Sequence, residues 1–475
     1  MAEKIIELVF IPFPVPSHLS ALVHLANLLT DTDPRLSVTI LVLKSPIDTK
    51  IDSFTKNSSN PRVRFVKIIP DDESRVPELM ENPKHFMLRF LESQKKYVRD
   101  AVAEIMEDQT RRIAGFVLDM FCTAMMEVAD EFRVPSYICF TCGAAVLGLM
   151  LHFQRLNDEF GFEYAAARYE GSDSELSIST YVNPYPASVL PSSVLEKDGV
   201  LLKNFKRFWD CKGIVINTFL ELESHAVESL LADESFPRIY PIGPMIQEPN
   251  GEEEQGKGGR EILEWLDQQP DSSVVYLCFG TNGCFEREQV KEIATALEKS
   301  GHRFLWSLRK PPPEGKFEMV GEYEDPEEVL PEGFLRRTAG AGRVIGWSPQ
   351  MAVLSHRSVG GFVSHCGWNS SLESVWCGVP LAVWPLFAEQ QANAFQFVKE
   401  LGMAVEIKMD YRKNCGIIVG AEKIETAIRE LMDPDNKIRV KIAAMKERSR
   451  VARGIGGSSR DFLDRLVQDF VHTVS

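Results

Sequence analysis

The sequence predicts an α/β protein with two domains of similar construction, and three features lead to this prediction. The chain has 475 residues, which is more than one hydrophobic core usually organises. Short apolar runs alternate with longer segments of helical periodicity, a pattern typical of parallel sheets covered by helices on both faces. A stretch crowded with Pro, Gly and Glu, residues 241–259, interrupts this alternation near the middle of the chain. We therefore expect two parallel sheets joined by a linker.

In the first half, short runs rich in Val, Ile and Leu predict strands, and apolar residues at helical spacing predict the helices between them. Ser, Pro and Asn gather at residues 171–197, which indicates a surface loop. The expected strands are 5–11, 36–43, 63–69, 115–118, 136–140 and 213–217, and the expected helices are 19–29, 86–106 and 144–156.

The alternation resumes after the linker. A charged loop rich in Pro, Gly and Glu is expected at 311–327, and the chain ends in helical patterns. The expected strands are 274–279, 304–307, 361–364 and 381–384, and the expected helices are 262–266, 287–299, 351–356, 369–377 and 421–431, with further helix within 438–469.

Composition and charge exclude some classes of binding partner and indicate the cellular compartment. A net charge of -15 argues against nucleic acid or an anionic membrane as a partner, because neither is attracted to an acidic surface. Nine cysteines, an odd number without metal-ligand spacing, suggest free thiols in a reducing compartment. No apolar run approaches the length of a membrane span, and three prolines break the first apolar run, which is unlike a signal peptide. We expect a cytoplasmic protein.

The strand expected at 361–364 ends in a turn that contains Gly367 and leads into the helix that opens at Asn369 and Ser370. In a parallel sheet, such a turn presents backbone N–H groups and the positive end of a helix dipole, which together bind anions. Ser370 and Glu373 also have the spacing of a capping box, an alternative that would make both residues purely structural.

The segment around this turn, residues 347–390, supplies every kind of group needed to bind a nucleotide sugar: an indole ring, carboxylates, side-chain amides and hydroxyls. It resembles, over its whole length, the signature segment of plant UDP-dependent glycosyltransferases that act on small secondary metabolites. The resemblance implies that Trp347 stacks on uracil, that Gln350 meets the ribose or the base, and that Glu373 binds the ribose hydroxyls. Taken singly, Trp347 and His365 are also compatible with ordinary core positions.

The same resemblance implies contacts to the diphosphate and to the sugar, and Gln at position 390 goes with glucose more often than with galactose. After the strand 274–279 relatives commonly show Gly-Ser where this chain has Gly-Thr, so a hydroxyl is kept. The implied diphosphate contacts are Thr281, His365, Gly367, Asn369 and Ser370, and the implied sugar contacts are Thr141, Trp368, Glu389 and Gln390.

The resemblance also implies the architecture and the activity. The fold is expected to be of the GT-B type, two Rossmann-like domains whose parallel sheets face a central cleft. We expect an acceptor-binding domain at 1–240, a linker at 241–260, a UDP-sugar-binding domain at 261–455, and a last helix, 456–475, that packs back on the first domain. The implied activity is inverting transfer of glucose from UDP-glucose, a co-substrate, to a small phenolic, flavonoid or stilbene-like metabolite. We expect no cofactor, no metal ion and a monomer.

A general base is expected in the first half. His18 follows the strand 5–11 at the start of a helix, for which Ser17 is a plausible N-cap, and this position favours the neutral imidazole. Asp119 follows the strand 115–118, so both side chains are expected at the carboxyl edge of one sheet, where they could form a catalytic pair. This pair resembles the catalytic dyad of the family. Relatives usually carry glycines before the histidine, where this chain has Pro14-Val15-Pro16-Ser17.

The acceptor is expected among apolar side chains of the first domain. Asp31-Thr32-Asp33 has the form of a D-x-D metal motif, but we expect a solvated turn there. An NAD-type oxidoreductase is a further alternative, but this chain has no G-x-G-x-x-G after its first strand. Within the family, the alternatives are another UDP-sugar as the donor, or a carboxylate as the acceptor, which would give a glucose ester. The candidate acceptor contacts are Phe13, Phe86, Phe121 and Phe140.

Overall fold

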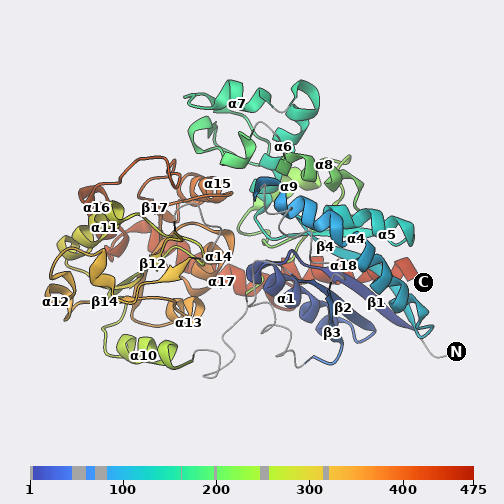
Figure 1. The fold of residues 1–475 in the computed structure, drawn as a ribbon, viewed down its shortest axis with the longest axis horizontal. Coiled ribbons are helices and arrows are strands. Elements are labelled where there is room, and N and C mark those ends of the chain that lie inside the picture. Colours follow the sequence, from blue (N-terminus) through green and yellow to red (C-terminus); the bar gives the residue numbers. More distant parts are fainter. Residues whose placement is uncertain are drawn as a thin grey trace. The chain divides into compact units, whose positions relative to one another are not determined.

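The computed structural model describes residues 4–44, 60–69, 83–161, 163–196, 200–246, 256–313 and 320–474 (Figure 1). Contacts divide the chain into two compact units. Unit 1 consists of Met1–Phe162, Asp198–Met245 and Val451–Ser475, and unit 2 consists of Glu163–Lys197 and Ile246–Arg450.

Unit 1 contains a seven-stranded parallel sheet with the strand order β3-β2-β1-β4-β5-β8-β9. The central strands are buried along almost their whole length, which explains why they are continuous apolar runs in the sequence. The bounds are β1 Ile5–Ile11, β2 Leu36–Leu43, β3 Val63–Ile68, β4 Arg111–Asp119, β5 Ser136–Phe140, β8 Gly213–Ile216 and β9 Arg238–Pro241.

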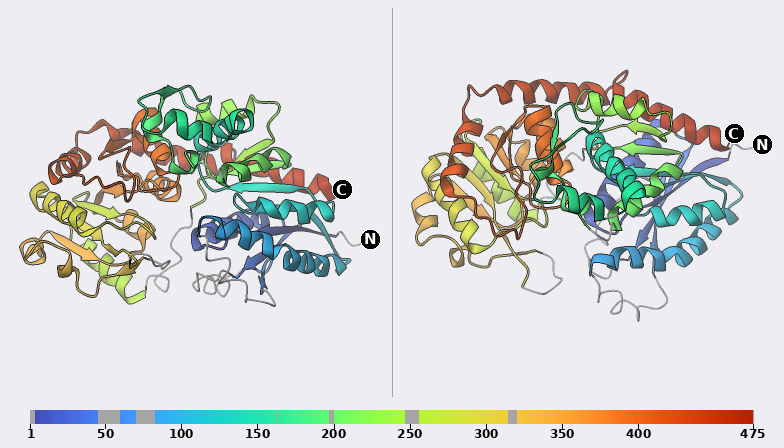
Figure 2. Two further views of the ribbon diagram at one scale, coloured as in Figure 1. Left: turned by 45° about the horizontal axis from the view of Figure 1, so that its top comes forward. Right: turned by 90° about the horizontal axis from the view of Figure 1, so that it is seen from above.

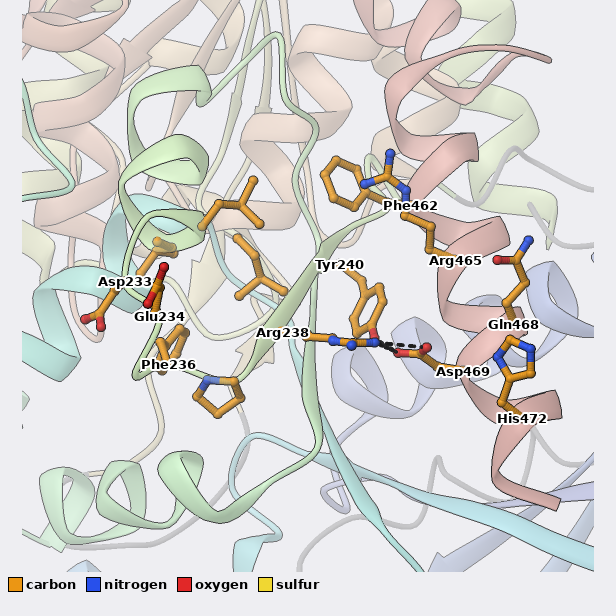
Figure 3. Close-up of a pocket in the computed structure, with 14 residues that line it drawn as sticks. Asp233, Glu234, Phe236, Arg238, Tyr240, Phe462, Arg465, Gln468, Asp469 and His472 are labelled. Carbon is orange, nitrogen blue, oxygen red and sulfur yellow. Dashed lines mark hydrogen bonds and ion pairs between the residues drawn. The ribbon is translucent and has the colours of Figure 1, made fainter. Parts of the chain in front are cut away.

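The helices of unit 1 cover this sheet. Leu22 of the first helix and Leu466 and Phe470 of the last helix share one hydrophobic core with the strands. The last helix, red in Figure 2, is also held by Asp469, which accepts hydrogen bonds from Arg238 and Tyr240 on β9 (Figure 3). The helices are α1 Pro16–Thr32, α4 Pro83–Glu107, α5 Met126–Glu131, α6 Ala144–Phe160, α8 Val200–Lys206, α9 Ser224–Leu231 and α18 Ser458–Val474.

Unit 2 contains a six-stranded parallel sheet with the order β14-β11-β10-β15-β16-β17. Every strand and helix expected in the second half is present, with ends that differ by up to six residues. The strands 342–345 and 404–406 and the helices 334–338 and 390–395 were not expected. The strands are β10 Val274–Cys278, β11 Arg303–Ser307, β14 Gly342–Ile345, β15 Val359–Ser364, β16 Leu381–Val383 and β17 Ala404–Glu406, and the helices are α10 Gly256–Asp267, α11 Arg287–Ser300, α12 Phe334–Thr338, α13 Gln350–Leu354, α14 Trp368–Cys377, α15 Gln390–Phe395 and α16 Ala421–Met432; α17, Lys437–Arg453, continues from unit 2 into unit 1.

The segment Glu163–Lys197 packs with unit 2, although the sequence pattern led us to expect residues 1–240 together. The rings of Tyr181 and Tyr185 lie against Phe395 of α15, with centroids 5.8 and 4.9 Å away. The Glu400 carboxylate accepts hydrogen bonds from the backbone N–H groups of residues 182 and 183, each at 2.9 Å. The segment contains a helix, α7 Glu163–Tyr169, and two short strands, β6 Glu175–Leu176 and β7 Tyr185–Pro186.

The loop expected at 311–327 is described only in part, because residues 314–319 lie outside the described residues. Just before and within the loop, two short strands pair with each other, β12 Arg309–Lys310 and β13 Gly321–Glu322. Within the described ranges, no helix is both long enough and apolar enough to cross a membrane.

Candidate active site

His18 lies in the first turn of α1, as expected, but the start of the helix differs from the expectation. The N-cap is Val15 and no side chain caps the helix, so the assignment of Ser17 as N-cap is wrong. Pro16 is the first helical residue, where its fixed φ suits the helix and its missing N–H would have had no helical partner. Of the two prolines just before His18, Pro16 therefore begins the helix and Pro14 precedes its N-cap.

Nδ1 of His18 and Oδ2 of Asp119 lie 2.7 Å apart. Asp119 is the last residue of β4, which pairs with β1 up to Ile11, so the ends of the two neighbouring strands bring together residues far apart in the chain. The Asp119 side chain is 0% exposed, and its other oxygen accepts the N–H of Phe121 at 3.0 Å. Because this carboxylate is fixed from both sides, it fixes the imidazole ring as well.

Two of the four phenylalanines expected near the acceptor surround His18. The rings of Phe13 and Phe121 lie 5.6 and 5.4 Å from the imidazole and 5.0 Å from each other. In contrast, Phe140 is buried against Phe205 and Phe208, and Phe86 is buried against Phe90. Their burial shows core packing, which the sequence pattern could not distinguish from a pocket wall.

Thr141, expected near the sugar, is buried just after β5. Its hydroxyl donates to the sulfur of Met120 at 3.6 Å.

In unit 2, His365 is enclosed between the loop after β10 and the start of α14. A Cβ atom added to either Gly280 or Gly367 would lie 2.6 Å from Nε2 of His365, so both glycines are required for this close approach. Burial lowers the pKa of His365 to about 4, which keeps the ring neutral at physiological pH. Within the described ranges, its Nδ1 has no hydrogen-bond partner.

Gln350, Ser370 and Glu373 form one hydrogen-bond network. The Gln350 amide donates to Ser370 Oγ at 2.9 Å and to Glu373 Oε2 at 2.6 Å. The N-cap of α14 is Gly367, and no side chain caps that helix, so the capping-box alternative for Ser370 and Glu373 is wrong. Burial raises the pKa of Glu373 to about 7.

Trp347 is 53% exposed, so it does not belong to the hydrophobic core. Its backbone N–H donates to Oε1 of Glu322 at 3.1 Å, a contact between β13 and the loop before α13 that sequence reasoning missed. An exposed indole can stack on a planar base.

The other three residues expected at the sugar, Trp368, Glu389 and Gln390, lie at the starts of two helices. Gln390 is buried, and its Oε1 accepts the N–H groups of Leu386 and Phe387 at 2.8 and 3.1 Å. Glu389, the N-cap of α15, accepts from Asn393 at 3.2 Å. Among the remaining expected residues, Trp368 is buried, Asn369 is partly buried and Thr281 is exposed.

Other candidate sites take no part in these networks. Asp33 of the D-x-D sequence is bound by Arg35 at 2.7 Å, and this hydrogen bond lowers the Asp33 pKa. No group of three His, Cys, Asp or Glu side chains suited to a metal ion occurs in the part of the chain that the structure describes. A cavity of about 440 Å³ lies between β9 and α18, and none of the expected site residues lines it (Figure 3).

These geometries can be compared with known proteins. The family described as "UDP-glucoronosyl and UDP-glucosyl transferase" matches residues 229–445. UDP-glycosyltransferase 71E1 of Stevia rebaudiana is 51% identical over 472 residues, which cover 97% of this chain and 98% of that protein. The chain belongs to the UDP-glycosyltransferase family.

Two further comparisons connect this UDP-glycosyltransferase with a named activity and a solved fold. UDP-glucose flavonoid 3-O-glucosyltransferase 6 of Fragaria ananassa is 48% identical over 482 residues, with 98% of each chain covered. The structure of Medicago truncatula UGT71G1 complexed with UDP-glucose is similar with a TM-score of 0.85 and 38% identity, covering 98% of each chain. The expected family and the expected GT-B class, two Rossmann-like domains with parallel sheets, are confirmed.

Proposed function

We propose that this glycosyltransferase transfers glucose from UDP-glucose to a hydroxyl of a small phenolic plant metabolite, with inversion, to give a β-glucoside. The observation that carries the chemical step is the contact of 2.7 Å between His18 and the buried Asp119. The names of the relatives, which include a flavonoid glucosyltransferase, support the donor and the class of acceptor.

In the proposed step, Nε2 of His18 accepts the proton of the acceptor hydroxyl. The acceptor oxygen forms a bond to the anomeric carbon while the bond from that carbon to the diphosphate oxygen breaks, and UDP leaves with the electron pair. Asp119 accepts the hydrogen bond from Nδ1 of His18. The carboxylate thereby selects the tautomer whose Nε2 can accept a proton and stabilises the imidazolium that forms.

For the leaving diphosphate, we propose that the N-terminus of α14 supplies the stabilisation that a metal ion gives in other transferases. The helix begins after Gly367, and its first amides and dipole favour a negative charge there. His365 stays neutral and can donate one hydrogen bond. Thr281, Asn369 and Ser370 complete the proposed set.

For the nucleoside and the sugar, we propose that uracil stacks on the exposed Trp347 and that Gln350 and Glu373 bind the ribose. Glu389, Gln390, Trp368 and Thr141 are the proposed sugar contacts, and Phe13 and Phe121 are the proposed apolar walls beside the acceptor oxygen. The ring contacts between these two phenylalanines and His18 support that last assignment.

We further propose that the protein works as a monomer in the cytosol. The nine cysteines all lie in the described ranges and none of them forms a disulfide bond, a state that a reducing compartment preserves.

The test is mass spectrometry of products formed from flavonoid, stilbene and carboxylate acceptors with UDP-glucose, UDP-galactose and UDP-xylose, with and without EDTA. We expect glucosides of hydroxyl acceptors, and turnover that EDTA leaves unchanged. A His18→Ala variant should lose about 10²- to 10⁴-fold in turnover while UDP still binds.

Three results would contradict parts of this proposal. Full turnover by the variant would exclude His18 as the base. Restoration by manganese after EDTA would exclude metal-independent transfer. Products from UDP-xylose alone, or glucose esters alone, would favour the alternatives within the family.

A further inference from the structure

Helix α15 carries three buried side-chain amides that hold three different loops. Gln390 accepts the backbone N–H groups of residues 386 and 387, as described above. Gln391 donates to the carbonyl of Tyr411 at 2.8 Å, and Asn393 donates to the carbonyl of Cys366 at 2.8 Å. Gln391 and Asn393 are both 0% exposed. One short helix thus ties together loops from three parts of unit 2.

Asn393 differs from its neighbours because it binds two elements of the proposed donor site at once. Its Nδ2 donates to the Cys366 carbonyl and also lies 3.2 Å from Oε1 of Glu389. An amide NH₂ has two hydrogens, so it can satisfy both acceptors. Because both neighbours are acceptors, the NH₂ group rather than the amide oxygen must face them, which fixes the orientation of the side chain.

The Cys366 carbonyl belongs to a turn with an unusual backbone. Cys366 has φ of 59°, a left-handed conformation that is unfavourable for a residue with a Cβ atom. It lies between His365 and Gly367, directly before α14. A hydrogen bond to its carbonyl therefore holds the turn that presents the imidazole and the first amides of α14.

We propose that Asn393 is a positioning residue that holds both the diphosphate turn, residues 365–367, and the sugar-contacting carboxylate of Glu389. The proposal rests on the donor roles proposed above and adds a residue that touches neither the diphosphate nor the sugar. Since one side chain holds both groups, its loss should weaken binding of the diphosphate and also reduce the contribution of the sugar to the affinity for UDP-glucose.

The main test uses Asn393→Ala and a matched control, Gln391→Ala. Both changes remove a fully buried amide from the same helix, but among the described residues the Gln391 amide is hydrogen-bonded to the Tyr411 carbonyl alone. Calorimetry would measure the affinities of each variant for UDP and for UDP-glucose, beside thermal unfolding of each protein. We expect Asn393→Ala to bind UDP about tenfold more weakly, and UDP-glucose more weakly still, with near-native affinities for Gln391→Ala.

A double-mutant cycle with Glu389→Ala separates the two effects. If Asn393 orients Glu389, then Asn393→Ala should no longer change the affinity ratio of UDP-glucose to UDP once Glu389 is absent, while its effect on UDP itself should remain. Should the alanine variant fail to fold, Asn393→Asp and Gln391→Glu form a second matched pair that preserves side-chain size.

The outcomes separate this inference from the proposed function. Equal donor affinities in Asn393→Ala and the wild type, or equal losses in the Asn393 and Gln391 variants, would overturn the positioning role and leave the donor assignment standing. Failure of the wild type to bind UDP or UDP-glucose would instead reject the proposed function. A loss of donor affinity confined to the Asn393 variants supports the inference.

Discussion

The two regions proposed to act in catalysis, the His18–Asp119 pair in unit 1 and residues 347–390 in unit 2, are built in opposite ways. The pair joins two side chains distant in sequence, which meet because β1 and β4 are neighbours and end at the same edge of the sheet. Most of the proposed donor site lies in one continuous segment whose loops are held by local hydrogen bonds. A recognisable local sequence is therefore expected for the donor site, whereas the pair depends on the correct sheet order.

The chemistry of the two regions differs in the same way. The pair offers one imidazole oriented by one buried carboxylate, a device for moving a proton. The donor segment offers an exposed indole, a helix N-terminus and amide–carboxylate contacts, which are devices for holding a ligand. Substitutions in the first region should change turnover, and substitutions in the second should change donor affinity.

Asp119→Asn should produce the largest effect in this comparison. An asparagine that donates to Nδ1 of His18 would leave Nε2 protonated and unable to accept the acceptor proton, so we expect turnover to fall about 10²-fold or more. Donor affinity should remain unchanged. Steady-state kinetics and UDP calorimetry on the same preparation would measure both quantities.

The double variant His18→Ala/Asp119→Asn provides the control for this result. If Asp119 acts through His18, the double variant should be no slower than His18→Ala, because the two residues work as one unit. Additive losses would instead show that Asp119 acts through the turn at Phe121, whose N–H it also accepts.

Trp347→Ala should have the reverse effect, with weaker donor binding as its primary defect. Stacking of a base on an aromatic ring is worth about 1–3 kcal/mol, so UDP should bind about fivefold to 150-fold more weakly. Trp347→Phe should recover part of the loss. Ile418→Ala is a suitable control because Ile418 has the same exposure, 53%, in the same unit. Unchanged UDP affinity in Trp347→Ala would contradict the stacking role.

The sequence predicts best those parts of the fold that depend on residues close together in the chain, and least well those that depend on contacts between distant residues. Periodicity predicted β1, β2 and β5 with the bounds observed, because buried parallel strands are continuous apolar runs. It could not show that Glu163–Lys197 packs with unit 2, since that depends on contacts with Phe395 and Glu400, which lie far away in the sequence.

A local motif was misleading where the same residue spacing is compatible with two different local structures. Ser370 and Glu373 have the spacing of a capping box, yet the helix begins at Trp368, and Gln350 binds both side chains. Asn393 was missed as well, although it stands four residues after Glu389, a spacing at which two side chains meet on a helix. The sequence alone could not show that the Cys366 carbonyl lies within hydrogen-bond distance of the Asn393 amide.

The pH dependence of donor binding should give the smallest effect and still tests the ribose contact directly. Burial raises the pKa of Glu373 to about 7, so the free protein keeps the proton that the unfolded chain loses near its ordinary value of 4.5. This group's contribution to stability is therefore present below pH 4.5 and is lost as the pH rises through 7.

If ribose hydroxyls donate to the ionised carboxylate, binding requires loss of that proton, and UDP-glucose affinity should be about tenfold lower at pH 6 than at pH 8. UDP-glucose is the suitable ligand because it lacks the terminal phosphate of UDP, which titrates in this range. A Glu373→Gln variant should bind with little pH dependence, and a pH dependence retained in that variant would assign the titration to another group.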